Sequence, residues 1–408
     1  MSNFKCAPKN DRSKNHNEYS LQFNRWFLKP IGAWPQTDES SLVWKILVLL
    51  QIFICSSIVA SNMIPCLLYV LFEKDNFKLK LNATVPLLHR VMGSIHYWVL
   101  LKRSGDISNL IRHMETDWCL VQRFDDREIM LQQAKFGRFV TIICGIMMQG
   151  GCLLFGIGHL MKTATISIGN ETFTKHVFPK TCPVYNKIID TRFSPVNEIV
   201  LILQNLTMLI VSSSTVGACS LAAVFAIHAC GQMNVLYEWL HELVKNQEKR
   251  NDKTKQKLGA VVEHHLRILS FISQMESIMH KISFVELTGC TVVMCLLGYY
   301  IIMAWETLDK AKITSYFILY LSTGFNIFIF CYIGGIVTEQ CKLVGEMAYM
   351  TDWYNLHHTT ARSLILIIAR SNNIIKITAG KLFHLSIATF GDVIKTSMAY
   401  LNFLRTMT

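Results

Sequence analysis

Long apolar runs separated by shorter polar stretches dominate the chain. Five runs contain no Asp, Glu, Lys or Arg, and they cover residues 46–72, 139–161, 199–231, 287–305 and 313–338. A helix rises about 1.5 Å per residue, so about 20 apolar residues cross the ~30 Å hydrocarbon core of a bilayer. The pattern therefore predicts helices that cross a membrane.

Two less apolar segments complete the predicted set. Residues 81–101 contain Arg90, which we expect to face the bundle interior and to pair with Glu286 or with the backbone of another helix. The chain ends in a helical run over residues 377–406, which is long enough to cross once. The sequence thus predicts an all-α membrane protein with seven transmembrane helices, at residues 42–72, 81–101, 139–161, 196–231, 283–305, 313–338 and 377–406.

A stripe of mostly polar residues follows one face of the last helix. At helical spacing, large apolar side chains such as Ile394 and Leu401 share the opposite face. The stripe includes Asp392, Lys395, Thr396, Ala399, Asn402, Phe403 and Thr406. A charge at the bilayer centre costs several kcal/mol unless protein or water surrounds it, so the stripe should face other helices or an aqueous path. Taken alone, such a stripe more often serves helix packing.

Composition supports a membrane protein, and charge gives its orientation. Of the 408 residues, 51% are hydrophobic and only 17% are charged. The net charge of +12 does not indicate nucleic acid, because Lys and Arg gather in alternate segments, at residues 5–29, 102–138, 245–257 and 342–381. The positive-inside rule places these segments and the N-terminus in the cytosol, and seven spans then place the C-terminus outside.

The predicted outer loops carry modification signals. Asn82 and Asn170 each begin an Asn-x-Thr pattern, so both are predicted glycosylation sites. Cys182, in the long loop 163–194, is the one cysteine placed for pairing, and its partner is not evident. Neither a disulfide scaffold nor a metal site is expected from the other, scattered cysteines. The polar start predicts no cleaved signal peptide, and the aromatic residues 23–35 are expected along the inner membrane surface.

Short motifs near both ends of the chain resemble one known family. They are Ala348-Tyr349, Trp353-Tyr354, Arg370-Ser371, Ile377-Thr378-Ala379-Gly380-Lys381, Leu385-Ser386, Thr389-Phe390, Lys395-Thr396-Ser397, Tyr400 and Leu404-Arg405. Together they resemble the C-terminal signature of insect odorant receptors, although a proline common in that signature is replaced by Ile374-Ile375. The tail segment from Trp26 to Pro35 is similar to that of hymenopteran tuning subunits.

The resemblance implies the odorant-binding subunit of an odour-gated, non-selective cation channel in the plasma membrane of an olfactory sensory neuron. Such a subunit works as a heterotetramer with the odorant co-receptor, and it binds small volatile hydrophobic ligands. The implied segments are a cytosolic N-terminal segment (1–41), transmembrane helices one to six with their loops (42–338), a cytosolic anchor helix (339–376) and a pore-lining transmembrane helix (377–408).

Two sets of site residues follow. Small-molecule sites are mostly apolar with few polar groups, and the predicted pocket is bounded by His89, Met92, Met148, Gly151, Phe155, His159, Tyr316 and Tyr320. For any single aromatic residue among them, interior packing is an equally good interpretation. The resemblance makes pore lining the better interpretation of the stripe on the last helix, and end alignment places Phe403 at the hydrophobic gate.

Two other receptor classes are weighed against this interpretation. A G-protein-coupled receptor would need an outside N-terminus, and its acidic-Arg-Tyr and Asn-Pro-x-x-Tyr motifs are missing from the sequence. A gustatory-receptor-like channel shares the topology and differs mainly in the C-terminal signature. No enzyme signature or cofactor motif is present, so no catalytic role is expected.

Overall fold

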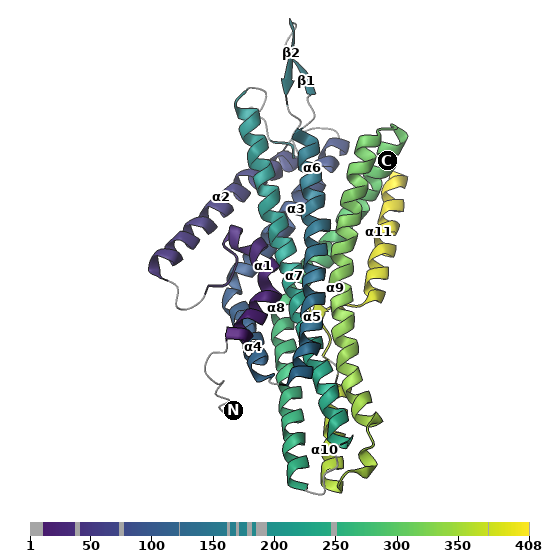
Figure 1. The fold of residues 1–408 in the computed structure, drawn as a ribbon. Coiled ribbons are helices and arrows are strands. Elements are labelled where there is room, and N and C mark those ends of the chain that lie inside the picture. The colour runs from purple at the N-terminus through teal and green to yellow at the C-terminus, as the bar shows by residue number, and fades with distance from the viewer. Residues whose placement is uncertain are drawn as a thin grey trace.

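The computed structural model describes residues 11–36, 41–72, 77–121, 123–160, 164–168, 171–177, 182–184, 194–245, 251–373 and 375–407. Long helices run side by side in an elongated bundle (Figure 1). They are α1 (Asp11–Leu28), α2 (Leu42–Phe72), α3 (Phe77–Lys102), α4 (Ser104–Leu120), α5 (Phe124–Cys144), α6 (Gly150–Leu160), α7 (Val196–Lys245), α8 (Asn251–Glu306), α9 (Lys310–Met350), α10 (His358–Asn372) and α11 (Ile387–Met407). The predicted all-α membrane fold is confirmed.

Five of the described helical segments are long and apolar enough to cross a membrane, and they are Leu42–Phe72, Phe124–Gly158, Val196–Leu243, Thr254–Glu306 and Lys310–Met350. A single turn of π-helix, Gly145–Gln149, joins α5 to α6 within the second of them. Helices α3 and α11 are not in this set; charged residues, Arg90 in one and Asp392 and Lys395 in the other, interrupt their apolar sequence. Both still pack along the long helices, and the count of seven membrane helices stays a prediction.

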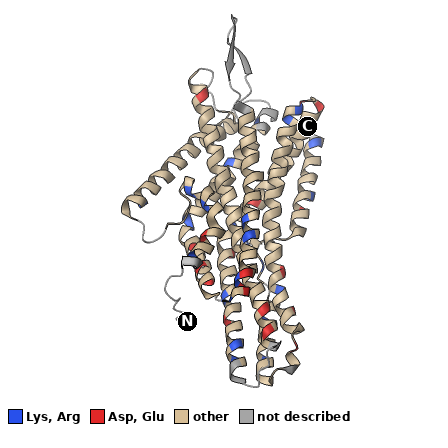
Figure 2. Ribbon diagram, viewed as in Figure 1, with Lys and Arg blue, Asp and Glu red and all other residues tan. Residues whose placement is uncertain are grey.

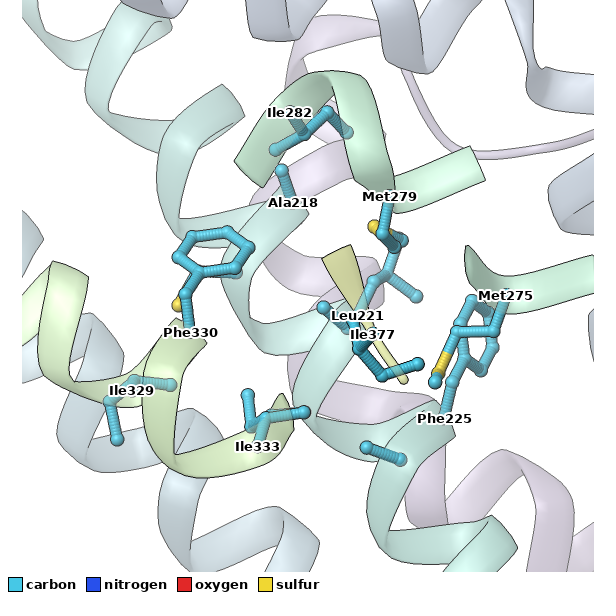
Figure 3. Packing of buried hydrophobic residues seen from close by; sticks show 14 of the residues in the cluster. Ala218, Leu221, Phe225, Met275, Met279, Ile282, Ile329, Phe330, Ile333 and Ile377 are labelled. Atoms are coloured by element: carbon cyan, nitrogen blue, oxygen red, sulfur yellow. The ribbon is translucent and has the colours of Figure 1, made fainter. Parts of the chain in front are cut away.

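Helix α7 is the centre of the bundle. In its most apolar stretch 89% of the residues are buried, against 11% in α2. Small residues on α7, such as Ala218, let neighbouring helices approach closely. Leu221 and Phe225 of α7 pack among Met275 of α8 and Ile377, as Figure 3 shows. Helix α2, by contrast, lies at the side of the bundle and exposes many apolar side chains, as a lipid-facing helix does (Figure 1).

Helices α7, α8 and α9 continue into the charged end of the bundle, where α10 joins them (Figure 2). Helix α7 extends beyond the predicted fourth span to Lys245, and α8 begins at Asn251, well before the predicted fifth span. The predicted anchor segment, residues 339–376, is not a single helix, and its role as a cytosolic anchor stays a prediction. Helix α9 ends at Met350, a 3-10 turn follows at Trp353–Asn355, and α10 is a separate helix.

A buried carboxylate, Asp117, joins α4, α7 and α8 in this charged half. Its Oδ2 lies 3.0 Å from Nε2 of His228, and its Oδ1 accepts a hydrogen bond of 2.5 Å from Nε of Arg267. Burial acts to raise the pKa of the Asp117 carboxyl. The hydrogen bond from His228 and the charge of Arg267 outweigh burial, so this pKa lies below its usual value.

The segment before the last helix forms a small hairpin rather than a helix. Strands β3 (Thr378–Ala379) and β4 (Phe383–His384) pair antiparallel, and Gly380 and Lys381 turn between them with φ of 62°. The amide of Gly380 donates to the carbonyl oxygen of His280 at 2.8 Å, which fixes the turn on α8. The predicted helix over residues 377–406 is therefore wrong in its first ten residues, and α11 begins at Ile387.

The aromatic tail packs into the bundle, where the sequence suggested only the membrane surface. Leu28 is fully buried and Ile31 is 4% exposed. The hydroxyl of Tyr97 on α3 donates to the carbonyl oxygen of Ile31 at 2.7 Å, and Asn24 Nδ2 donates to Ser220 Oγ on α7 at 2.8 Å. The tail thus holds α1 against the core.

The end of the bundle opposite α10 carries the second hairpin, strands β1 (Ala164–Ile168) and β2 (Glu171–Val177), which projects beyond the helices (Figure 1). Nearby, Cys182 forms a disulfide with Cys66 of α2, so its partner is now identified. Asn170 lies outside the described residues, as does the side chain of Asn82. Glycosylation at both positions stays a prediction.

Candidate ligand cavity and last helix

A cavity of about 300 Å³ lies among α3, α6, α7, α8 and α9. Its volume matches the lower end of known small-molecule sites. The structure brings five residues of the predicted pocket to its wall, namely His89, Met92, Met148, Phe155 and Tyr316. Side chains widely separated in the sequence therefore meet at one cavity.

The other three predicted pocket residues do not line this cavity. A Cβ atom added at Gly151 would lie 3.5 Å from Cβ of the cavity residue Ser322, so Gly151 provides close packing of α6 against α9. Tyr320 is half-buried and packs on the core beside the cavity. The side chain of His159 lies outside the described residues.

Two tyrosines and several apolar side chains form one part of the wall. Tyr300 and Tyr316 lie with ring centroids 5.4 Å apart, and the hydroxyl of Tyr300 donates to the carbonyl oxygen of Leu81. Val85, Val293 and Leu297 complete this apolar surface. Such a wall suits a hydrocarbon ligand, because it removes apolar surface from water.

A polar group of side chains forms another part of the wall. Glu286 is 2% exposed, and its Oε2 accepts hydrogen bonds from Asn326 Nδ2 at 2.7 Å and from Cys290 Sγ at 2.9 Å. Its Oε1 lies 3.3 Å from Nδ1 of His96, which is itself 3.2 Å from Oγ1 of Thr215. Of these, Glu286, Asn326, Cys290 and Thr215 line the cavity.

The expected pairing of Arg90 with Glu286 is wrong, whereas pairing with the backbone of another helix stays a prediction. Arg90 Nη1 donates to the carbonyl oxygen of Pro86 in its own helix at 3.1 Å, and the carboxyl group of Glu286 contacts the ring of His96 instead. Sequence reasoning placed an acid near this helix but missed its role in the cavity. The sequence feature that could have indicated this role is a single Glu directly before the apolar run 287–305, together with a His in the predicted span 81–101.

A loop segment closes one side of the cavity. Pro183 lines the cavity directly after Cys182, which is tied to Cys66. Gln204 of α7 holds the backbone of Cys182 from both sides. It accepts from the Cys182 amide at 3.3 Å and donates to the Cys182 carbonyl at 2.8 Å. The disulfide and this amide pair together position the loop.

The stripe on the last helix faces away from the bundle. All seven of its predicted pore residues are exposed, whereas Val393 and Ser397 are buried on the opposite face. Lys395 Nζ lies 3.9 Å from Asp392 Oδ1, with the two side chains 83% and 74% exposed. This face is consequently available to other subunits or to water, and its role in a pore stays a prediction.

A model of the family described as 7tm Odorant receptor matches residues 76–398. The chain belongs to this odorant receptor family. Among curated relatives, odorant receptor 13a of Drosophila melanogaster is 25% identical to this chain, over 49% of this chain and 53% of the relative. Odorant receptor 10 of Aedes albopictus is 24% identical to this chain, over 36% of this chain and 38% of the relative. The match thus spans about half or less of the length of these relatives.

The odorant receptor fold is also that of a solved relative. The insect olfactory receptor OR5 from Machilis hrabei in complex with eugenol aligns over 98% of this chain and 100% of that chain, with a TM-score of 0.80. A second structure of the same receptor aligns with a TM-score of 0.75. Sequence identities are 13% and 14%, so the likeness shows the fold.

Proposed function

We propose that the chain is the odorant-binding subunit of an odour-gated, non-selective cation channel. The observation that carries this proposal is the largely apolar cavity of about 300 Å³ within a chain of the odorant receptor family. Small volatile hydrophobic molecules fit such a cavity, since its wall offers apolar side chains with a few polar groups. The ligand site is therefore assigned to the cavity among α3, α6, α7, α8 and α9.

The conducting part is assigned to α11. Its stripe from Asp392 to Thr406 is exposed, while residues such as Val393 and Leu404 pack against the bundle. Three further subunits would place this face around a central path, in a heterotetramer with the odorant co-receptor. Polar rings then set ion selectivity, and Phe403 forms a hydrophobic constriction that gates by excluding water. The assembly belongs in the plasma membrane of an olfactory sensory neuron.

Co-expression with the co-receptor tests this assignment. We expect odour-evoked cation current only when both subunits are present, whereas a gustatory-receptor-like channel would conduct without the co-receptor. Phe155→Ala, on the cavity wall, should change the odour response profile. Tyr320→Ala is the matched control, because this residue packs beside the cavity without lining it.

The result that contradicts the ligand site is equally specific. An unchanged response profile in Phe155→Ala, at normal surface expression, would place the odorant elsewhere. For the pore, single residues along α11 are replaced by cysteine, and a water-soluble thiol reagent is applied during odour-evoked current. We expect the reagent to modify Asn402→Cys and Thr406→Cys. Reaction confined to Ile394 and Leu401 would exclude the stripe as pore lining.

A further inference from the structure

The polar part of the cavity wall has acceptor atoms that the described residues leave unsatisfied. Glu286 Oε1 contacts His96 at 3.3 Å but accepts no hydrogen bond of good geometry from the residues that the structure describes. Asn326 Oδ1 also accepts no hydrogen bond from the described residues, while Nδ2 of the same side chain donates to Glu286 Oε2. Both side chains are at least nine-tenths buried, and both residues line the cavity. The two oxygen atoms are themselves fully buried, so a ligand donor reaches them only when these side chains turn towards the cavity.

Glu286 Oε1 and Asn326 Oδ1 each lack a hydrogen-bond donor among the residues that the structure describes. A carboxylate oxygen can only accept hydrogen bonds when ionised, and an amide oxygen can only accept. A buried acceptor without a partner costs about 1–3 kcal/mol, and more when the group is charged. A ligand that brings an O–H or N–H group to this point removes the cost, whereas a ligand with acceptors alone leaves it in place.

Three neighbouring polar side chains, Cys290, Thr215 and Arg90, do not compete for the same role. Cys290 already donates to Glu286 Oε2, and the hydroxyl of Thr215 is bonded within α7 to the carbonyl oxygen of Val211 at 3.2 Å. Arg90 is the one cationic Lys or Arg side chain on the described cavity wall, and it donates to the carbonyl oxygen of Pro86. Glu286 and Asn326 are therefore the groups that discriminate at this point.

We propose that the cavity selects ligands that carry a hydrogen-bond donor, a hydroxyl or an amino group, directed at Glu286 and Asn326. A cavity of about 300 Å³ holds the liquid volume of about ten water molecules, so the ligand has about ten non-hydrogen atoms. Its hydrocarbon body lies against Val293, Leu297 and Tyr300. This inference rests on the proposed function, because it takes the cavity as the odorant site.

Matched isomers provide the test. In cells that express the chain with its co-receptor, dose–response curves are measured for 1-nonanol and methyl octyl ether, and for 3-phenyl-1-propanol and methyl 2-phenylethyl ether. Each pair has the same atoms and differs in the donor. We expect the alcohol to be about 10- to 100-fold more potent than its ether, as one hydrogen bond to a charged group supplies. Nonylamine and 3-phenylpropylamine show whether an ammonium group is preferred to a hydroxyl.

A charge-removing variant links the preference to its residue. Glu286→Gln keeps the shape of the side chain but replaces the carboxyl group by an amide, so the ratio of alcohol to ether potency should fall towards one. The amines should lose more potency than the alcohols. Tyr316→Phe is the matched control, since it removes a hydroxyl from the tyrosine part of the wall. In this control the ratio should be unchanged, whatever happens to the absolute potency.

The outcomes separate the two proposals. If wild-type current is evoked equally by alcohols and ethers, or if Glu286→Gln at the cell surface keeps the full preference, the donor rule is wrong and the odour-gated channel stands. Should Glu286→Gln fail to reach the surface, the wild-type isomer pairs alone decide. No current from any alcohol or amine, with the chain at the surface and co-receptor current intact, also overturns the donor rule. The channel is then judged separately by its co-receptor dependence.

Discussion

Replacing Asp117 by Asn should destabilise the protein without touching the cavity. The carboxylate is 5% exposed and faces His228 at 3.0 Å and Arg267 at 2.5 Å. Asn has nearly the same size, but it has no charge and one acceptor fewer, so one of the two facing donors loses its partner. Removing one member of a buried ion pair costs about 3–5 kcal/mol. Because the Arg267 side chain is 29% exposed and can reach water, we expect about 3 kcal/mol.

Thermal unfolding of the detergent-solubilised complex with the co-receptor measures this loss. For a chain of this length, 1 kcal/mol corresponds to about 1–2 °C, so the midpoint should fall by about 3–6 °C. Asp106→Asn is the matched control on the same helix. Its ion pair with Arg103 has a distance of 2.7 Å but lies at the surface, with side chains 33% and 48% exposed. Such a pair contributes about 0–1 kcal/mol.

Equal midpoints for Asp117→Asn and Asp106→Asn would refute the reasoning. A double-mutant cycle sharpens the test, since Arg267→Gln and Asp117→Asn should cost together clearly less than the sum of their separate costs. Additive costs would mean that the short contact between the two side chains contributes nothing of its own.

Three further predictions concern other parts of the molecule. A Cβ atom at Gly334 would lie 2.4 Å from Cβ of Leu385, so Gly334→Ala should lower stability by about 1–3 kcal/mol. Gly335→Ala, where no described atom lies within 4 Å, should not, and equal stability of the two variants would exclude this contact. Phe403→Ala should raise the current measured without odour while the rank order of odours is kept, because it removes a bulky apolar side chain from the pore face. Burial lowers the pKa of His113 and outweighs the raising effect of Asp117, and the nearby Arg267 lowers this pKa further. The unfolded chain, whose histidine pKa is about 6.5, therefore takes up this proton at a higher pH than the folded chain does. Stability should then fall from pH 7.5 to 5.5, and His113→Asn should flatten that change in the midpoint.

The apolar runs predicted the long helices well, because the length of an uninterrupted apolar run is enough to indicate a membrane-crossing helix. The first span was expected at residues 42–72, and α2 covers Leu42–Phe72. The start of the last helix could not be predicted in this way. Residues 375–386 are held by contacts to distant residues, such as the bond from Thr378 Oγ1 to Glu276 Oε1 at 2.6 Å. Helical spacing cannot reveal such contacts.

The candidate site was predicted only in part for a similar reason. His89, Met148 and Tyr316 were found because a small-molecule site was expected to combine apolar side chains with a few polar groups. Glu286 was considered only as a partner for a charge. Its position on the cavity wall depends on how α8 is rotated, and sequence spacing gives that rotation only to about a quarter turn. The partner of Cys182 depended on which helix lies beneath the outer loop.

Helix α8 contacts the cavity and the last helix with different faces of one short stretch. Glu286 and Cys290 line the cavity, whereas Phe284 touches Gly380 of the hairpin and Gly298 lies close to Leu401 of α11. From residue 286 to residue 298 an α-helix rises about 18 Å. If ligand binding favours the open pore through this helix, then opening of the pore favours ligand binding by the same free energy. A substitution in the hairpin that favours the open pore must then tighten ligand binding, although it lies outside the cavity.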